Sequence, residues 1–113
     1  MHRTIVGTGF PHQSAKWQIM EPVYAQIAAE CQALRSFGSA ALGVAYVACG
    51  RLEGYLQLGL SFYDVAAAVC LVREAGGEVR ELGNKEWNVR SRSILATNSK
   101  IGMEKFLKDF SLS

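Results

Sequence analysis

The beginning of the chain shows a strand-like pattern followed by a helix-like one. β-Branched residues and then a Gly-Thr-Gly stretch predict a buried strand over residues 3–10. From residue 15 to residue 32 apolar positions recur at three- and four-residue steps, which predicts a helix. Pro22 has no backbone N–H to donate, so we expect it to lie early in this helix or to mark a restart.

Three further helices are indicated by their end signals. Gly38, Ser39 and Ala40 are predicted to open a helix with Ser39 as its N-cap and Gly50 as its C-terminal stop. Residues 61–64 have a capping-box pattern, which predicts a helix running to residue 75 and ending at a Gly-Gly pair. Asn98 is predicted to cap the last helix. Segments with extended or alternating patterns predict the remaining strands, at residues 33–37, 53–58, 78–82, 86–89 and 93–97.

Strands and helices therefore alternate, and the predicted fold class is α/β or layered α+β. With 113 residues, of which 50% are hydrophobic, the chain is expected to form one domain, residues 1–113, around one core. We find no internal repeat, linker or low-complexity segment.

Charge and hydropathy exclude some classes of function. A net charge of +2 gives little support for a nucleic-acid partner, and the basic group Lys85, Arg90 and Arg92 is expected to be a solvated loop. Charged residues interrupt the most apolar region, so no membrane span is expected. The N-terminal residues lack the pattern of a secretory signal, and a cytoplasmic location is the default expectation.

The cysteines and histidines point to no metal or nucleophile chemistry of their own. Cys31, Cys49 and Cys70 are widely spaced among apolar residues, which favours reduced core thiols over disulfides or a metal site. The two histidines, His2 and His12, leave little basis for a zinc site or a Ser-His-Asp triad.

The predicted helix start at Gly38, Ser39 and Ala40 is one candidate binding site. A helix N-terminus combines unpaired backbone amides with the positive end of the helix dipole. With no bulky side chain there, a phosphate or a sugar hydroxyl has room to approach the backbone. The alternative is an ordinary N-cap in which glycine provides the turn.

Asp64 is the second candidate, because it and Asp109 are the only aspartates in the chain. An aspartate in the first turn of a helix is explained by capping and the helix dipole alone. Its neighbours suggest more: Tyr63 precedes it, Gln57 lies one strand back, and Gly59 leaves room at the turn. Together they are expected to form a polar rim on a cleft, and both interpretations stay open at this point.

The order of residues resembles a known family. Residues 34–77, which end in Glu-Ala-Gly-Gly, resemble without gaps the C-terminal half of the inositol monophosphatase family, and so do TGFPH at residues 8–12 and ILATN at residues 94–98. The resemblance implies the C-terminal half of an αβαβα sandwich, with a mixed sheet flanked by helices. It also implies a magnesium-dependent phosphomonoesterase, in which clustered carboxylates hold Mg²⁺ and activate a water.

The resemblance also implies roles for individual residues. Asp64 matches the family's C-terminal metal ligand. Gly38, Ser39 and Ala40 match the stretch that contacts the ring hydroxyls and phosphate of the substrate. Gln57 falls where the family commonly has a glutamate that touches an inositol hydroxyl.

One departure from the family pattern changes the functional expectation. Family members are about twice this length or more, and their remaining metal ligands lie in an N-terminal half that has no counterpart here. Because one carboxylate cannot hold a two-metal site, we expect the chain alone to have no appreciable phosphatase activity.

The expected partners follow from the same departure. They are the missing N-terminal half or a second copy, with an inositol or sugar phosphate as substrate once the site is complete. An uncovered apolar face also favours a homo-oligomer. The alternatives are a noncatalytic interaction module, for example one binding transcription or RNA-processing machinery, and a small anion-binding protein that uses the amides at residues 38–40.

Overall fold

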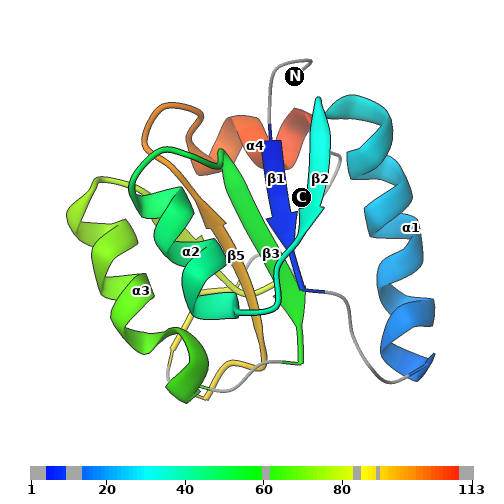
Figure 1. Ribbon diagram of the computed structural model, residues 1–113, viewed down its shortest axis with the longest axis horizontal. Coiled ribbons are helices and arrows are strands. Elements are labelled where there is room, and N and C mark those ends of the chain that lie inside the picture. The colour runs from blue at the N-terminus through cyan, green and yellow to red at the C-terminus, as the bar shows by residue number, and fades with distance from the viewer. Residues whose placement is uncertain (1–4, 10–13, 60–61, 83–84, 89, 110–113) are drawn as a thin grey trace.

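A computed structural model of the chain describes residues 5–9, 14–59, 62–82, 85–88 and 90–109 (Figure 1). Its nine described elements alternate between strands and helices in the first part of the chain and finish with two strands and a short helix. In chain order they are β1 (Ile5–Thr8), α1 (Ser14–Glu30), β2 (Ala33–Ser36), α2 (Ala40–Ala48), β3 (Gly54–Leu58), α3 (Phe62–Glu74), β4 (Glu78–Arg80), β5 (Ser93–Thr97) and α4 (Met103–Asp109).

The strands form one mixed sheet in the order β2-β1-β3-β5-β4. β1 pairs in parallel with both β2 and β3, whereas β5 is antiparallel to β3 and to β4. The predicted strand at residues 86–89 is reduced, in its described part, to a single bridge between Glu86 and Arg80. The predicted class, a mixed sheet flanked by helices, is confirmed.

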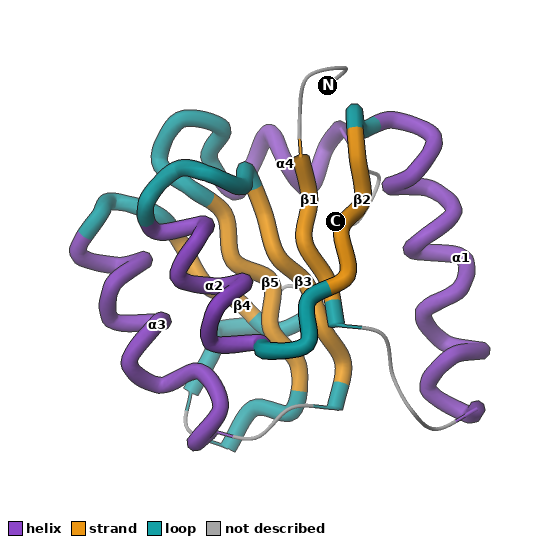
Figure 2. The backbone as a smooth tube through the Cα atoms, in the orientation of Figure 1, coloured by secondary structure: helices purple, strands orange, loops and turns teal. Residues whose placement is uncertain are grey.

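Helices cover both faces of the sheet, so the domain has three layers (Figure 2). α2 and α3 pack on one face, where side chains such as Val47, Val69 and Ile94 form one buried cluster. On the other face α1 and α4 enclose a second cluster that includes Ile27 and Phe106. Because β-strand side chains alternate between faces, each central strand contributes to both clusters.

The predicted ends of α2 and α3 are confirmed. The Ser39 side chain accepts a hydrogen bond from the Leu42 amide at 3.2 Å, as an N-cap does. Gly50 and Gly76 follow the two helices with φ of 83° and 84°, the left-handed conformation in which glycine commonly stops a helix. Ser61 lies outside the described residues, so the predicted capping box stays a prediction.

Two helix predictions were wrong. Pro22 lies inside the continuous helix α1 rather than near its start. It is exposed, and Met20 before it and Ile27 after it pack into the same buried cluster, so tertiary packing offsets the missing backbone hydrogen bond. Asn98 caps a single turn, accepting from the Ile101 amide at 2.9 Å, and α4 begins only after Gly102.

The cysteine prediction was half right. Cys31, Cys49 and Cys70 are free, as expected, but they are not core residues. Cys31 is half-buried, and the other two are exposed because Cys49 is the C-cap of α2 and Cys70 lies on the solvent side of α3. An apolar sequence neighbourhood did not distinguish the inner side of these helices from the outer side.

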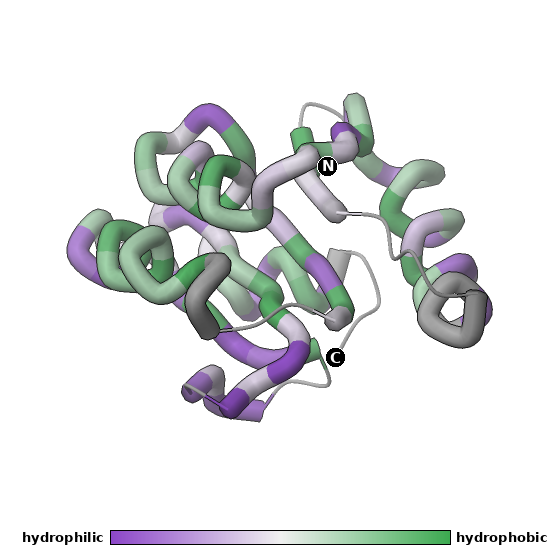
Figure 3. The backbone as a smooth tube through the Cα atoms, turned by 60° about the horizontal axis from the view of Figure 1, so that its bottom comes forward, coloured by the Kyte–Doolittle hydropathy of each residue, from purple (hydrophilic) through white to green (hydrophobic). Residues whose placement is uncertain are grey.

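α2 and α3, the two helices on one face of the sheet, carry apolar residues on their outer side. Figure 3 shows hydrophobic colouring over most of α2 and α3. Leu42 of α2 is 46% exposed and Leu71 of α3 is 53% exposed. In the described part of the chain, the large apolar side chains that are exposed thus lie on the outer surface of α2 and α3 and not on the sheet.

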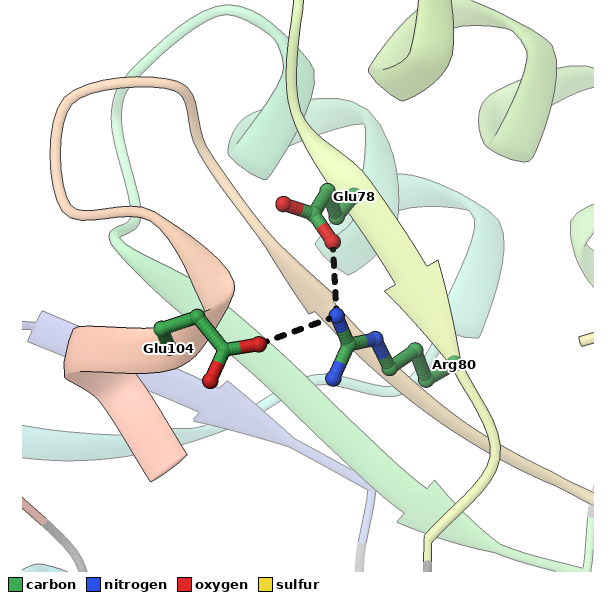
Figure 4. A network of polar contacts seen from close by, with 3 residues as sticks. All are labelled: Glu78, Arg80 and Glu104. Atoms are coloured by element: carbon green, nitrogen blue, oxygen red, sulfur yellow. Dashed lines mark hydrogen bonds and ion pairs between the residues drawn. The ribbon is translucent and has the colours of Figure 1, made fainter. Parts of the chain in front are cut away.

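A small charge network lies at the β4 edge of the sheet, the edge opposite β2 (Figure 4). The Arg80 guanidinium on β4 lies 3.1 Å from the Glu78 carboxylate and 3.3 Å from that of Glu104 on α4. It joins α4 to the edge strand, although such solvent-accessible ion pairs contribute only about 0–1 kcal/mol each.

None of the described helices has the length and hydropathy that crossing a membrane requires.

The contact between α2 and β3 yields the first prediction. A Cβ atom at Gly43 would lie 2.5 Å from Cδ2 and 3.0 Å from Cζ of the buried Tyr55 ring. We expect Gly43→Ala to lower the free energy of unfolding by a net ~1–2 kcal/mol, because overpacking outweighs the gain of about 1 kcal/mol in helix propensity. Gly38→Ala is the matched control, since a Cβ there meets open space. Urea unfolding followed by circular dichroism measures both, and equal stabilities would contradict the prediction.

A pair of buried threonines yields the second prediction. Thr8 Oγ1 donates to the Leu56 carbonyl at 2.7 Å, whereas Thr97 Oγ1 is buried with no hydrogen-bond partner among the described residues. We expect Thr8→Val to destabilise the fold by ~1–2 kcal/mol and Thr97→Val to be neutral or slightly stabilising, because only the first loses a bond. Chemical denaturation of both variants tests this. A larger loss for Thr97→Val than for Thr8→Val would refute it.

Candidate functional site

The candidate site residues lie along one edge of the sheet. β2, β1 and β3 are parallel, and α2 and α3 each follow one of these strands and return toward its beginning. The N-termini of both helices therefore lie at the carboxyl ends of the parallel strands, the lower edge in Figure 1. In open α/β sheets this is the edge at which ligands bind.

The first turn of α2 is accessible at this edge. Gly38 and Ser39 are exposed and Ala40 is half-buried. The Phe37 amide donates to the Thr8 carbonyl at 2.8 Å, which fixes the entry to the turn against β1. Ser39 Oγ accepts from the Leu42 amide, and its O–H can still donate to a ligand, as can the backbone amides of the first turn beside the open space at Gly38.

Gln57 lies near the end of β3 and is half-buried. Its Oε1 accepts a hydrogen bond from the Tyr55 hydroxyl at 2.6 Å. Tyr55 itself is fully buried, and burial raises the pKa of its hydroxyl far above the usual value, with a smaller contribution from Tyr24. The hydroxyl therefore keeps its proton and acts as the donor.

Asp64 occupies the third position of α3, in the first turn, as predicted. Its side chain and that of Tyr63 lie outside the described part of the structure, so the proposed ligand role stays a prediction. Among the described side chains, no three His, Cys, Asp or Glu residues are grouped closely enough to hold a metal ion. The described side chains of this chain alone therefore do not fit a two-metal site.

The basic residues Lys85, Arg90 and Arg92 are exposed, as expected of a solvated loop. The loop is attached near the site, because the Arg92 carbonyl accepts from the Gly59 amide at 2.6 Å directly after β3. It is thus hydrogen-bonded to the residue that directly follows β3.

Sequence reasoning missed Tyr55 and Gly9. Tyr55 and Gln57 are two residues apart in a strand, so their side chains share a face, and Gly9 faces them from just beyond the end of the neighbouring strand β1. The two-residue spacing of Gly7 in β1 and Gly9 directly after it was a signal that a large side chain lies across from them.

This arrangement of strands and helix starts has close counterparts. The family model described as "Inositol monophosphatase family" matches residues 4–113. The chain belongs to the inositol monophosphatase family.

Relatives share both sequence and fold with this chain. It is 38% identical over 101 residues to an inositol-1-monophosphatase of Mesorhizobium japonicum and 37% identical over 99 residues to Nus factor SuhB of Escherichia coli. Each alignment covers 87% of this chain and 37% of the relative. The structure of inositol monophosphatase from Anabaena superposes with a TM-score of 0.84 at 33% identity, over 97% of this chain and 45% of that one. The extragenic suppressor protein suhB of Bartonella henselae gives 0.82 at 33% identity, over 96% and 42%.

The chain thus spans less than half the length of these family members. The sheet with its flanking helices matches part of the relatives' fold. The activity of the whole relatives concerns more residues than this chain contains.

Proposed function

We propose that this chain is the substrate-contacting half of a magnesium-dependent phosphomonoesterase acting on an inositol or sugar phosphate. The observation that carries the proposal is that Gln57 and the starts of α2 and α3 lie at one edge of the sheet, at the carboxyl ends of the parallel strands. In this proposal the backbone at Gly38, Ser39 and Ala40 binds the substrate, and Gln57 orients it.

The metal chemistry is divided between this chain and a partner. Asp64 supplies one hard oxygen ligand, and a second segment, corresponding to the part of the relatives that this chain does not match, supplies the others. Bound Mg²⁺ contributes Lewis-acid stabilisation of the phosphate and a more acidic water. This chain's own residues bind and orient the phosphate ester at the start of α2, using backbone amides and the helix dipole.

A complementation experiment tests the proposed function. We expect the purified chain alone to release no phosphate from inositol 1-phosphate with Mg²⁺, and a fusion to the unmatched N-terminal part of the Anabaena relative to do so. Asp64→Asn should reduce the rate of phosphate release by the fusion more than about 100-fold. Loss of an outer-shell partner of a metal site typically costs only about 10- to 100-fold. Asp109→Asn, at the other aspartate of the chain, is the matched control and should keep the rate.

Two results would count against this assignment. One is magnesium-dependent hydrolysis by the chain alone that Asp64→Asn abolishes, because the chain would then need no partner. The other is a folded fusion with no activity at any metal concentration. A noncatalytic role in binding another protein would then be the better explanation.

We also propose that the outer surface of α2 and α3 is where the partner segment packs, and that copies of the chain associate through it when the segment is absent. The supporting feature is the exposure of Leu42 and Leu71 on adjacent helices. In light scattering we expect a concentration-dependent oligomer that the double variant Leu42→Lys/Leu71→Lys shifts toward the monomer. Gln32→Lys, at an exposed position after α1, is the control. A wild-type chain that stays monomeric at high concentration would rule this out.

A further inference from the structure

The Tyr55 side chain occupies a space that three glycines leave open. A Cβ atom at Gly7 would lie 2.9 Å from Cδ2 of Tyr55, and one at Gly9 would lie 3.1 Å from its hydroxyl oxygen. At Gly43 on α2 it would lie 2.5 Å from Cδ2. The ring is therefore held between β1 and α2. The space is so narrow that only glycine, which has no Cβ atom, fits at those three positions.

Phe37 closes this space from the entry to α2. Its ring packs edge-on against Tyr55, with ring centroids 6.2 Å apart and planes at 67°. Phe37 immediately precedes Gly38, and its amide is bonded to β1. Tyr55 thus contacts the elements that carry both parts of the candidate site, the start of α2 and the end of β3.

The Tyr55 hydroxyl determines how the Gln57 amide is presented. It donates to Gln57 Oε1 at 2.6 Å, and a Cβ at Gly9 would lie 2.7 Å from Gln57 Cδ. The carbonyl side of the amide is therefore both hydrogen-bonded and sterically confined. A glutamine whose oxygen is engaged in this way has two N–H donors left, whereas a glutamate has only acceptors.

We propose that Tyr55 is a positioning residue that holds the Gln57 carbonyl inward, so that its Nε2 group donates to an anionic oxygen of the bound molecule. The inference deepens the proposed function, on which it rests, by naming the chemistry of the group that faces β3. That group is a hydrogen-bond acceptor, because the amide has only N–H donors left to offer, and among acceptors an anionic oxygen of a phosphate or carboxylate forms the stronger bond.

The positioning role is tested by nuclear magnetic resonance on the full chain. The ¹⁵N heteronuclear NOE of the Gln57 side-chain amide should be high in the wild type and should fall in Tyr55→Phe to the value of the exposed Gln32. Tyr46→Phe is the matched control, because that ring packs against the same Phe37 at 5.6 Å. It should leave the Gln57 signal unchanged. Backbone spectra of Tyr55→Phe that keep the wild-type pattern show that the fold is intact. A Gln57 amide equally ordered in Tyr55→Phe overturns the inference.

The chemistry of the ligand is tested by titration with inorganic phosphate and, in parallel, with myo-inositol. Phosphate should shift the Gln57 Nε2–H resonances of the wild type more than myo-inositol does. In Gln57→Glu the phosphate affinity should fall about tenfold or more, because the position then offers a negative charge and no donor. No phosphate-induced shift in the wild type, or equal affinity in the variant, overturns the inference.

These outcomes are separable from the test of the proposed function. An inactive fusion combined with an ordered, phosphate-sensitive Gln57 amide would refute the phosphatase assignment and support the inference. An active fusion with a disordered Gln57 amide would support the phosphatase assignment and refute the inference about Tyr55.

Discussion

The parallel pairing of β1 with β2 and β3 is the constraint on which the position of the candidate site depends. A parallel pair requires a crossover connection, and here α1 joins β1 to β2 while α2 joins β2 to β3. A helix that follows a strand and leads to a parallel one must run antiparallel to both. α2 therefore begins where its strand ends, and α3 begins at the same edge after β3. The presence of both helix starts at this edge follows from the strand directions in the sheet rather than from a local sequence motif.

Close packing around Tyr55 requires small residues on the α2 side of the sheet. α2 lies so close to β3 that its fourth residue, Gly43, has only a hydrogen atom toward the Tyr55 ring. Gly7 of β1 and Gly9 directly after β1 also lie close to the Tyr55 side chain. One aromatic ring thus fills a space bounded by three elements. A substitution there changes helix position and side-chain orientation together, since close-packed interiors transmit such changes.

Local signals predicted the elements well where their cause is local. Ser39 and Gly50 mark the ends of α2 because capping and left-handed φ are properties of a few consecutive residues. The position of Pro22 and the burial of the cysteines were mispredicted, because these environments depend on the packing of distant segments. Whether Pro22 is tolerated depends on the cluster that Met20 and Ile27 join, and no window around the proline contains that information.

The candidate site was predictable to a similar extent. The positions of Gly38, Ser39, Ala40 and Gln57 followed from helix and strand signals together with the family resemblance, and the structure brings their elements to one edge. The hydrogen bond between Tyr55 and Gln57 was not predicted, because the orientation of a glutamine amide depends on a neighbouring hydroxyl and on the space beside Gly9. The metal-ligand role of Asp64 rests on the resemblance alone.

The division between fold and chemistry has a physical basis. Folding requires both faces of the sheet to be covered, and α1 and α4 on one side with α2 and α3 on the other meet that requirement within the described residues. Two-metal chemistry instead requires several carboxylates within a few ångströms, and these need not come from the layers that bury the core. A segment can therefore contain a complete hydrophobic core and only part of a catalytic site. The features found in this chain, backbone groups at a helix start and a glutamine amide held by Tyr55, are suited to ligand recognition, and the proposed function assigns the remaining metal ligands to a second segment.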